Sequence, residues 1–321
     1  MQSLRSRIYL FLLKHRHWLR LQRRPRAIDA STSVPALRQR ADASSSRFGR
    51  VPSDVHVQPV TIAGCSAEWI VPAQAGRQGV LLYFHGGGYV MGSLQSHRSV
   101  IARIARECGV AALHFDYRLA PEHPFPAALN DAMAVHAALR AQGHAAASIV
   151  FMGDSAGGGL CLATLLALRD LGLPMPAGAV ALSPWTDLTC SGPSYRRRDP
   201  LAPPGSWQTF ARYYAAGTDP ATPWISPLHA ALDGLPPLLI HVGECESMLD
   251  DSVQFADRAA AAGVSVQLRT GRGMMHCYPL FAPRFPEAVA ALRETAAFVR
   301  RVLAGDQEAG DGRCVVAPRS A

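Results

Sequence analysis

Short apolar runs alternate with longer amphipathic stretches along most of the chain. The runs are rich in Val, Leu, Ile and Phe and predict strands, whereas the stretches repeat apolar residues at helical spacing. The predicted strands are 55–62, 67–71, 79–84, 110–115, 148–152, 178–182, 238–242 and 264–269. The predicted helices are 94–108, 124–142, 158–171, 248–262 and 286–303. This alternation favours an α/β fold, with a mostly parallel sheet covered by helices on both faces.

The alternation stops between Trp185 and Leu235, where proline and aromatic residues dominate around one helix-like stretch at 205–216. An insertion at this point would lie above the carboxyl ends of the strands, where open α/β sheets bind substrates. We therefore predict a cap, with a long surface loop as the alternative. The aromatic side chains predicted to line the substrate pocket are Tyr89, Trp185, Tyr213 and Trp224.

Residues 3–22 predict an amphipathic helix at the N-terminal end. Its apolar positions lie between arginines and are Leu4, Ile8, Phe11, Leu12, Trp18 and Leu19. One interpretation is that this face closes over the substrate site as a lid, and we favour it. The other is a weak contact with an anionic membrane surface, for which a basic amphipathic helix is suited. Residues 25–50 are interpreted as a connector.

Charge is concentrated in the same region. The chain of 321 residues has a net charge of +8, but residues 1–50 hold 12 basic and two acidic residues. The remainder is therefore close to neutral, at −2. A uniformly basic surface for nucleic acid is excluded, and no aromatic residues interleave with a basic stripe.

The seven cysteines show no C-x-x-C spacing, which argues against a zinc site and a disulfide framework. A reducing cytoplasm is the default location for such a chain. The apolar run Ile8–Leu13 has six residues before Lys14 interrupts it, which is too short for a signal-peptide core or a membrane span.

Residues 153–157 read Gly-Asp-Ser-Ala-Gly between a predicted strand and a predicted helix. This is the context of a nucleophile elbow, in which a sharp turn exposes the serine hydroxyl. Glycine on both sides lets the backbone bend without a clash at Cβ. Ser155 is therefore the predicted nucleophile.

Residues 85–88 read His-Gly-Gly-Gly directly after the strand 79–84. Ester hydrolysis creates an oxyanion that needs preorganised N–H donors, and a glycine-rich loop can turn its amides inward. We predict that Gly87, Gly88 and Ala156 are these donors, with His85 and Gly86 completing the loop motif. An ordinary glycine turn is the alternative, and the serine elbow downstream makes it less favoured.

His276 is the predicted base because it alone, among 12 histidines, follows the last strand in a loop before the last helix. The orienting acid should follow strand 238–242, where Glu244, Glu246, Asp250 and Asp251 lie. Glu246 is preferred because it lies in the loop itself. Asp250 is the alternative, although it opens the next helix, where an acidic residue is favourable for helix stability alone.

These motifs together resemble the hormone-sensitive-lipase-like family of α/β-hydrolases, the bacterial short-chain carboxylesterases, from about residue 78 to about 303. The matching segments are HGGGYVMGS (85–93), DYRLAPEHPFPAALND (116–131), GDSAGGGL (153–160), SPWTDL (183–188), ISPL (225–228), GECESMLDDS (243–252) and GMMH (273–276). The family's acid is usually Asp, and the matching residue here is Glu246.

The resemblance implies a division of the chain into parts. Family caps combine N-terminal helices with the insertion after the elbow, so residues 1–50 and 185–230 would form the cap. The α/β-hydrolase core would be 51–184 and 231–303, followed by a loose tail at 304–321. Three charged residues of the segment 116–131, Asp116, Arg118 and Glu122, are expected to support the glycine loop and not to take part in the reaction. Asp154 is likewise expected to be structural.

The expected function is hydrolysis of short-chain carboxylic esters by a serine carboxylesterase, with an acyl-enzyme intermediate and no metal or organic cofactor. The expected partner is a small ester; no nucleic acid and no membrane span are expected, and a homodimer is left open. A lactone hydrolase or a deacetylase of a natural product would use the same triad. A non-catalytic receptor on this fold is disfavoured because Ser155, His276 and a carboxylate are all present.

Overall fold

The computed structural model describes residues 2–16, 18, 27–43, 48–76, 79–197 and 199–305. The predicted apolar position Leu19 and the predicted tail beyond residue 305 lie outside the described residues.

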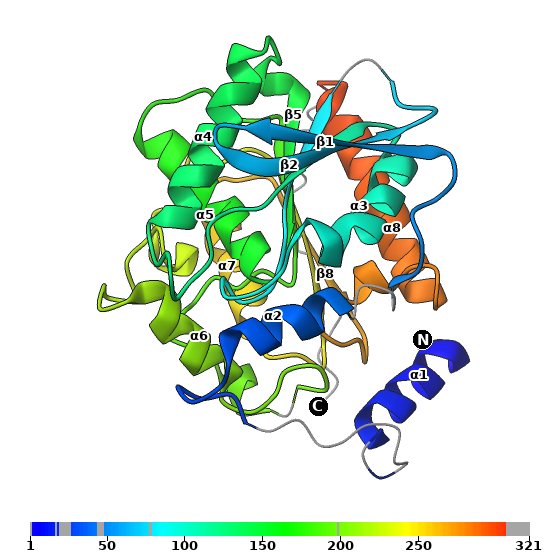
Figure 1. The fold of residues 1–321 in the computed structure, drawn as a ribbon, viewed down its shortest axis with the longest axis vertical. Helices are drawn as coiled ribbons and strands as arrows, with labels where there is room; N and C mark the ends of the chain where they lie inside the picture. Colours follow the sequence, from blue (N-terminus) through cyan, green and yellow to red (C-terminus); the bar gives the residue numbers. More distant parts are fainter. Residues whose placement is uncertain are drawn as a thin grey trace.

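One eight-stranded sheet crosses the molecule in the order β1-β2-β4-β3-β5-β6-β7-β8 (Figure 1). The strand pairs β1·β2 and β2·β4 are antiparallel and all the others are parallel. The strands are β1 Val55–Ile62, β2 Cys65–Pro72, β3 Val80–Phe84, β4 Ala111–Phe115, β5 Ile149–Asp154, β6 Gly178–Leu182, β7 Leu238–Gly243 and β8 Val266–Gly271. The predicted α/β fold with a mostly parallel sheet is confirmed.

Helices cover both faces of the sheet, because the central strands are apolar on both sides. Every residue of β3 and β5 is buried. Successive side chains point to opposite faces, so Leu81 and Leu82 belong to separate core clusters. The first cluster holds α4 Ala127–Ala141, α5 Ala156–Asp170 and α7 Leu249–Ala261, and the second holds α3 Leu94–Cys108 and α8 Pro286–Leu303.

The insertion after β6 contains α6 Ser206–Ala215 and the short helices η3 Pro193–Arg196 and η4 Pro227–His229. It meets the segment that leads into the helix α2 Val34–Ala43, and Figure 1 shows α2 and α6 at the same end of the molecule. Ile28 donates its N–H to the carbonyl of Pro204 at 2.9 Å and accepts from the Thr209 hydroxyl at 3.1 Å. The prediction of a connector over 25–50 missed α2.

The helix α1 Leu4–His15 docks on the start of α8 with its polar side. The backbone N–H and hydroxyl of Ser3 and the hydroxyl of Ser6 all bond to the carboxylate of Glu287, and Leu10 is buried nearby. The side chains expected to close over the substrate site are instead exposed, namely Leu4 (70%), Ile8 (52%), Phe11 (52%), Leu12 (43%) and Trp18 (79%). The predicted burial of this face is therefore wrong, because the serine bonds to Glu287 turn the opposite face inward.

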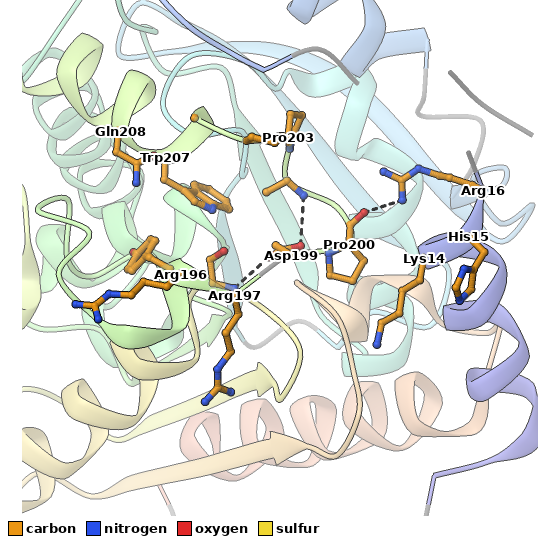
Figure 2. A pocket seen from close by; sticks show the side chains of 15 residues that line it. Lys14, His15, Arg16, Arg196, Arg197, Asp199, Pro200, Pro203, Trp207 and Gln208 are labelled. Atoms are coloured by element: carbon orange, nitrogen blue, oxygen red, sulfur yellow. Dashed lines mark hydrogen bonds between the residues drawn. The ribbon is translucent and has the colours of Figure 1, made fainter. Parts of the chain in front are cut away.

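A hollow of about 890 Å³ lies between the end of α1 and the insertion. Figure 2 shows Lys14, His15 and Arg16 on one side of it, facing Trp207 and Gln208 of α6. Arg16 spans the two parts, donating to the carbonyl of Pro200 at 2.7 Å. Within the described residues, no helix is both long and apolar enough to span a bilayer.

Candidate active site

Ser155 occupies the sharp turn between β5 and α5. Its backbone lies at φ +53° and ψ −122°, a conformation that non-glycine residues rarely adopt. The turn is held by the Ser155 N–H, which donates to the carbonyl of Leu182 at 2.8 Å. A residue held in a strained conformation by its surroundings is typical of a functional site.

Both flanking glycines are required by close backbone approaches. A Cβ on Gly153 would lie 2.3 Å from the carbonyl oxygen of Gly157. A Cβ on Gly157 would lie 2.1 Å from the carbonyl oxygen of Phe84. The G-x-S-x-G spacing in the sequence therefore has a steric origin in this structure.

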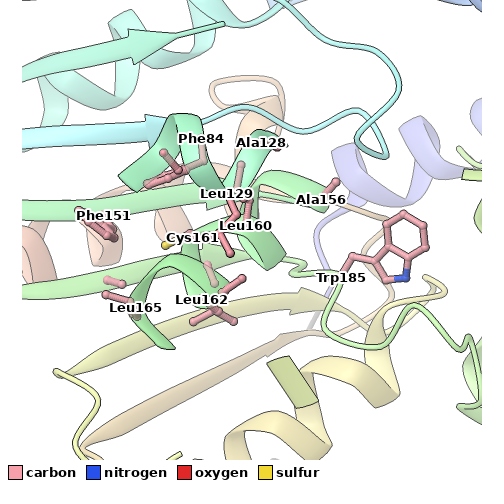
Figure 3. Close-up of a cluster of buried hydrophobic side chains, with 14 of the residues drawn as sticks. Phe84, Ala128, Leu129, Phe151, Ala156, Leu160, Cys161, Leu162, Leu165 and Trp185 are labelled. Atoms are coloured by element: carbon pink, nitrogen blue, oxygen red, sulfur yellow. The ribbon is translucent and has the colours of Figure 1, made fainter. Parts of the chain in front are cut away.

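The helix after the elbow rests on a densely packed core. Figure 3 shows Leu160, Cys161 and Leu165 of α5 beside Phe151 of β5, and all four are fully buried. Because close-packed protein interiors are hardly compressible, this core fixes the position of Ser155 at the start of the helix.

His276 lies in the loop after β8 and reaches the serine. Its Nε2 is 2.9 Å from the Oγ of Ser155, and its Nδ1 is 3.2 Å from the Oε1 of Glu246. In the tautomer that this arrangement requires, Nδ1–H donates to the carboxylate and Nε2 accepts from the serine hydroxyl. The structure thus brings together the three residues predicted to form a triad.

Glu246 is buried, with 1% of its surface exposed, and its second oxygen is also bonded. Oε2 accepts from the N–H of Gly243 at 2.8 Å and from the hydroxyl of Ser183 at 2.9 Å. The alternative acid, Asp250, accepts instead from the N–H of Ser194 at 2.6 Å. The geometry favours Glu246 over Asp250 as the partner of the imidazole.

The charge of Glu246 acts on the imidazole of His276. Burial opposes protonation of the ring, but the negative charge of the Glu246 carboxylate favours it and raises the His276 pKa above its ordinary value. Burial also raises the pKa of Cys277 to about 11, so its thiol is neutral near pH 7. The carboxylate is therefore the charge that favours the imidazolium. Burial in turn raises the pKa of Glu246, and the nearby His276 lowers it in part.

The loop 85–88 presents N–H groups beside the elbow. Within the described part of the chain, the N–H groups of Gly87, Gly88 and Ala156 donate no hydrogen bond. Gly87 and Gly88 have φ of +127° and +65°, and a Cβ on Gly88 would lie 2.4 Å from the ring of Phe210. Free N–H groups on this loop and at the elbow are what the predicted role as oxyanion donors requires.

A buried polar network fixes this loop. Asp154 accepts from the Tyr83 hydroxyl at 2.9 Å and from the Gly86 N–H at 3.0 Å. The buried His85 ring stacks on Tyr117 at 4.3 Å, and the Tyr117 hydroxyl donates to the His85 carbonyl at 2.7 Å. The contacts of Asp154 fit the supporting role expected for it.

The three charged residues of the segment 116–131 are also held by polar contacts. Asp116 accepts from the N–H of Leu94 at 2.8 Å, and Arg118 pairs with Asp131 at 2.7 Å. Glu122 pairs with Arg38 of α2 at 2.6 Å. These contacts fit the structural role predicted for the segment.

The aromatic residues of the predicted pocket separate into two places. Trp185 and Tyr89 are buried near the elbow, with ring centres 6.1 Å apart. Tyr213 is half-buried against the core. Trp224 donates its indole N–H to Asp170 at 2.9 Å, at the opposite end of α5 from Ser155. Its predicted place in the pocket is wrong, since a 15-residue helix spans roughly 20 Å.

Two residues of the site were missed in the sequence. The ring of Trp207 lies 5.6 Å from the ring of His276 and 5.4 Å from that of Trp185, and Trp207 also lines the hollow beside α1. Ser183 bonds to Glu246. The one sequence feature that could have indicated Ser183 is its place at the start of the SPWTDL segment. No sequence feature distinguished Trp207, which contacts His276, from Trp224, which does not.

Known proteins resemble this chain over most of its length. A family model described as the alpha/beta hydrolase fold matches residues 81–280. An acetyl-hydrolase of Streptomyces hygroscopicus is 43% identical over 265 residues, which cover 81% of this chain and 87% of that protein. The crystal structure of an esterase from the bacterial hormone-sensitive lipase family has a TM-score of 0.86 and 37% identity, covering 94% of this chain and 99% of that one.

A second solved structure, EstE5 soaked with p-nitrophenyl butyrate, has a TM-score of 0.85 and 40% identity. The match covers 94% of this chain and all of that one. The range 81–280 includes Ser155, Glu246 and His276.

Proposed function

Because the chain belongs to the hormone-sensitive-lipase-like family of α/β-hydrolases and is a carboxylic ester hydrolase, we propose that it cleaves short-chain esters through an acyl-enzyme on Ser155. Family membership confirms the resemblance carried by the motifs at 85–93 and 153–160. The acyl-enzyme mechanism and the preference for short acyl chains do not follow from family membership alone, and they are what we propose.

The hydrogen-bonded chain from Ser155 through His276 to Glu246 is the observation that supports a serine mechanism. A hydroxyl is a weak nucleophile unless an adjacent base removes its proton. His276 is within reach of that proton, and Glu246 would hold the imidazole in the required tautomer and stabilise the imidazolium.

In the first half-reaction, the Oγ of Ser155 attacks the ester carbonyl carbon while its proton passes to Nε2 of His276. The carbonyl oxygen becomes an oxyanion that the N–H groups of Gly87, Gly88 and Ala156 would receive. The C–O bond to the alcohol then breaks, and His276 returns the proton to the leaving alkoxide. The acyl group remains on Ser155.

In the second half-reaction, His276 takes a proton from a water molecule that attacks the acyl carbon. A second oxyanion forms in the same place. Its collapse breaks the bond to Oγ, Ser155 regains a proton from His276, and the carboxylic acid leaves. The only co-reactant is water, so atoms and charges balance.

The preference for short acyl chains is supported by the aromatic rings around the base. The ring of Trp207 lies against His276 and the ring of Trp185 lies against Trp207, so these two rings would limit the space for an acyl chain. A relative is named an acetyl-hydrolase and a similar structure was soaked with p-nitrophenyl butyrate, so both names concern small acyl groups. The acetyl-hydrolase name also favours, as a second candidate, removal of acetyl groups from a natural product by the same residues.

The test combines labelling with kinetics. A p-nitrophenyl phosphonate or phosphate triester should add one phosphoryl group to Ser155, located by mass spectrometry. Ser155→Ala should abolish labelling and lower kcat by several orders of magnitude. Ser148→Ala, the matched control, removes the hydroxyl of a half-buried residue just before β5, and that hydroxyl bonds to the carbonyl of Ala145. Retention of more than a tenth of the activity by a folded Ser155→Ala variant would rule out the mechanism.

A further inference from the structure

The outward face of α1 holds an unusual share of the exposed apolar surface. Among the described residues, seven large apolar side chains are exposed, and five of them lie in the segment 4–18. The other two, Leu171 and Leu173, follow α5. Scattered apolar residues on a surface are ordinary, but a contiguous group marks an interaction site.

The docking of α1 fixes which side faces outward. Ser6 and Leu10 are buried against the body, and Ser3 and Ser6 bond to Glu287. With about 100° of rotation per residue, the opposite side of the helix carries Leu4, Ile8, Phe11 and Leu12. We call this group the outer apolar stripe. It points away from the hydrolase core and so cannot serve as a lid.

Cations border the outer apolar stripe on both sides. The same helical geometry places Arg7 and Lys14 along one edge and Arg5 and Arg16 along the other. Residues 2–18 contain no acidic residue in the sequence. An apolar stripe between two rows of cations is the arrangement of helices that lie in the plane of a lipid interface.

We propose that α1 docks the enzyme on an anionic lipid membrane surface, with the outer apolar stripe at the boundary between headgroups and acyl chains. Arg5 and Arg7 would meet the lipid phosphates, whereas the guanidinium of Arg16 is held by the carbonyls of Leu13 and Pro200. A second copy of the chain is a poorer occupant, because it would bring the same cations against these. The proposal concerns binding and holds whether or not the acyl-enzyme mechanism is correct.

Docking would also orient the hollow beside the triad. Lys14, His15 and Arg16 at the end of α1 form one wall of the hollow, and Trp207, which contacts His276, lines another. The mouth of this hollow would therefore lie close to the headgroup layer. Together with the proposed function, this places the enzyme where membrane-partitioned esters are concentrated.

The test is sedimentation of the full chain with vesicles of phosphatidylglycerol and phosphatidylcholine, compared with phosphatidylcholine alone. The wild type should bind the anionic vesicles and be released by high salt. The double variant Phe11→Ser and Leu12→Ser should bind at least tenfold more weakly. The variant Leu171→Ser and Leu173→Ser changes two exposed leucines away from α1 and should bind like the wild type. Circular dichroism checks that each variant is folded.

A variant with reversed charges separates the electrostatic attraction to anionic lipid from the insertion of the outer apolar stripe. Arg5→Glu and Arg7→Glu should weaken binding and flatten its salt dependence. Failure of the wild type to bind anionic vesicles, or equal loss in the Leu171 and Leu173 variant, would overturn the proposal. If the wild type bound no vesicles and the Phe11 and Leu12 variant converted a dimer to a monomer, the stripe would be a dimer interface. If that variant lowered kcat/KM on p-nitrophenyl acetate in vesicle-free solution, the stripe would serve the active site directly. Either result would contradict the proposal.

Discussion

The hydroxyl of Ser183 donates to Oε2 of Glu246 at 2.9 Å, and the Oγ of Ser183 accepts from the N–H of Cys277 at 2.9 Å. Ser183 therefore joins the loop that carries the proposed acid to the loop that carries His276. It is fully buried, at the end of β6, with a φ of +49°. One side chain thus sets the separation of two loops that come from different strands.

Ser183→Ala is expected to lower kcat by about 10- to 100-fold, because a hydrogen bond to a charged group contributes about 1.5–3 kcal/mol. KM on p-nitrophenyl acetate should change little, since Ser183 acts through Glu246 and does not face the substrate. Ser99→Ala is the control, as its buried hydroxyl makes no hydrogen bond within the described residues. Equal loss in both variants, or a change confined to KM, would contradict this positioning role.

Glu246→Gln should lower kcat/KM by roughly 10⁴-fold, because the amide can present its NH₂ group to Nδ1 and select the wrong tautomer. Asp250→Asn should remain within about twofold, since an amide oxygen can still accept from the N–H of Ser194 and the imidazole bonds to Glu246 instead. Steady-state hydrolysis of p-nitrophenyl acetate measures both. A larger loss in Asp250→Asn would show that Asp250 is the acid.

The pH profile should report the raised pKa of His276. The base must be neutral, so kcat/KM should rise with pH through the His276 pKa, above the ordinary value of about 6.5. The Glu246 carboxylate favours the imidazolium, so Glu246→Gln should move this rise to lower pH as well as reduce its height. An unmoved or upward-shifted limb in the variant would mean that another group controls it.

Gly88→Ala should lower kcat by about 10²–10³-fold, the loss typical of one oxyanion donor. The added Cβ would lie 2.4 Å from the ring of Phe210, so the loop must shift and move its N–H. Gly263→Ala is a matched control, because Gly263 also has a positive φ (+82°) but nothing lies within 4 Å of its Cβ position. The control should lose about 1–2 kcal/mol of stability and no kcat. Comparable kcat losses would point to backbone strain alone.

The elbow could be predicted from sequence because its chemistry is local. Gly153 is dictated by a contact within the turn and Gly157 by its contact with the end of β3, and the flanking strand and helix are strongly apolar. The placement of His276 and Glu246 follows from parallel topology, since both come after strands that end at the same edge of the sheet.

The orientation of α1 and the existence of α2 could not be predicted in the same way. Both faces of α1 carry apolar residues, and the bonds of Ser3 and Ser6 to Glu287, about 280 residues away, decide which faces inward. The helix α2 has a weak apolar pattern, and tertiary contacts support it. Its Arg38 donates to the carbonyls of Val90 and Ala120. Such long-range contacts leave no local pattern.

Trp207→Ala is the last prediction and tests what limits the acyl chain. The indole lies between His276 and the hollow of about 890 Å³ beside α1. Its removal should connect that space with the site around Ser155, so the ratio of kcat/KM on p-nitrophenyl octanoate to that on p-nitrophenyl acetate should rise at least tenfold, as a hydrophobic pocket gains about 0.8 kcal/mol per buried CH₂. Loss of the contact with the imidazole should also raise KM for the acetate. Trp224→Ala is the matched control, because it removes the other insertion tryptophan at the far end of α5, where its indole bonds to Asp170. That variant should lose stability without changing the ratio. If Trp224→Ala shifts the ratio and Trp207→Ala does not, then the pocket extends along the other side of the insertion and the aromatic limit lies there.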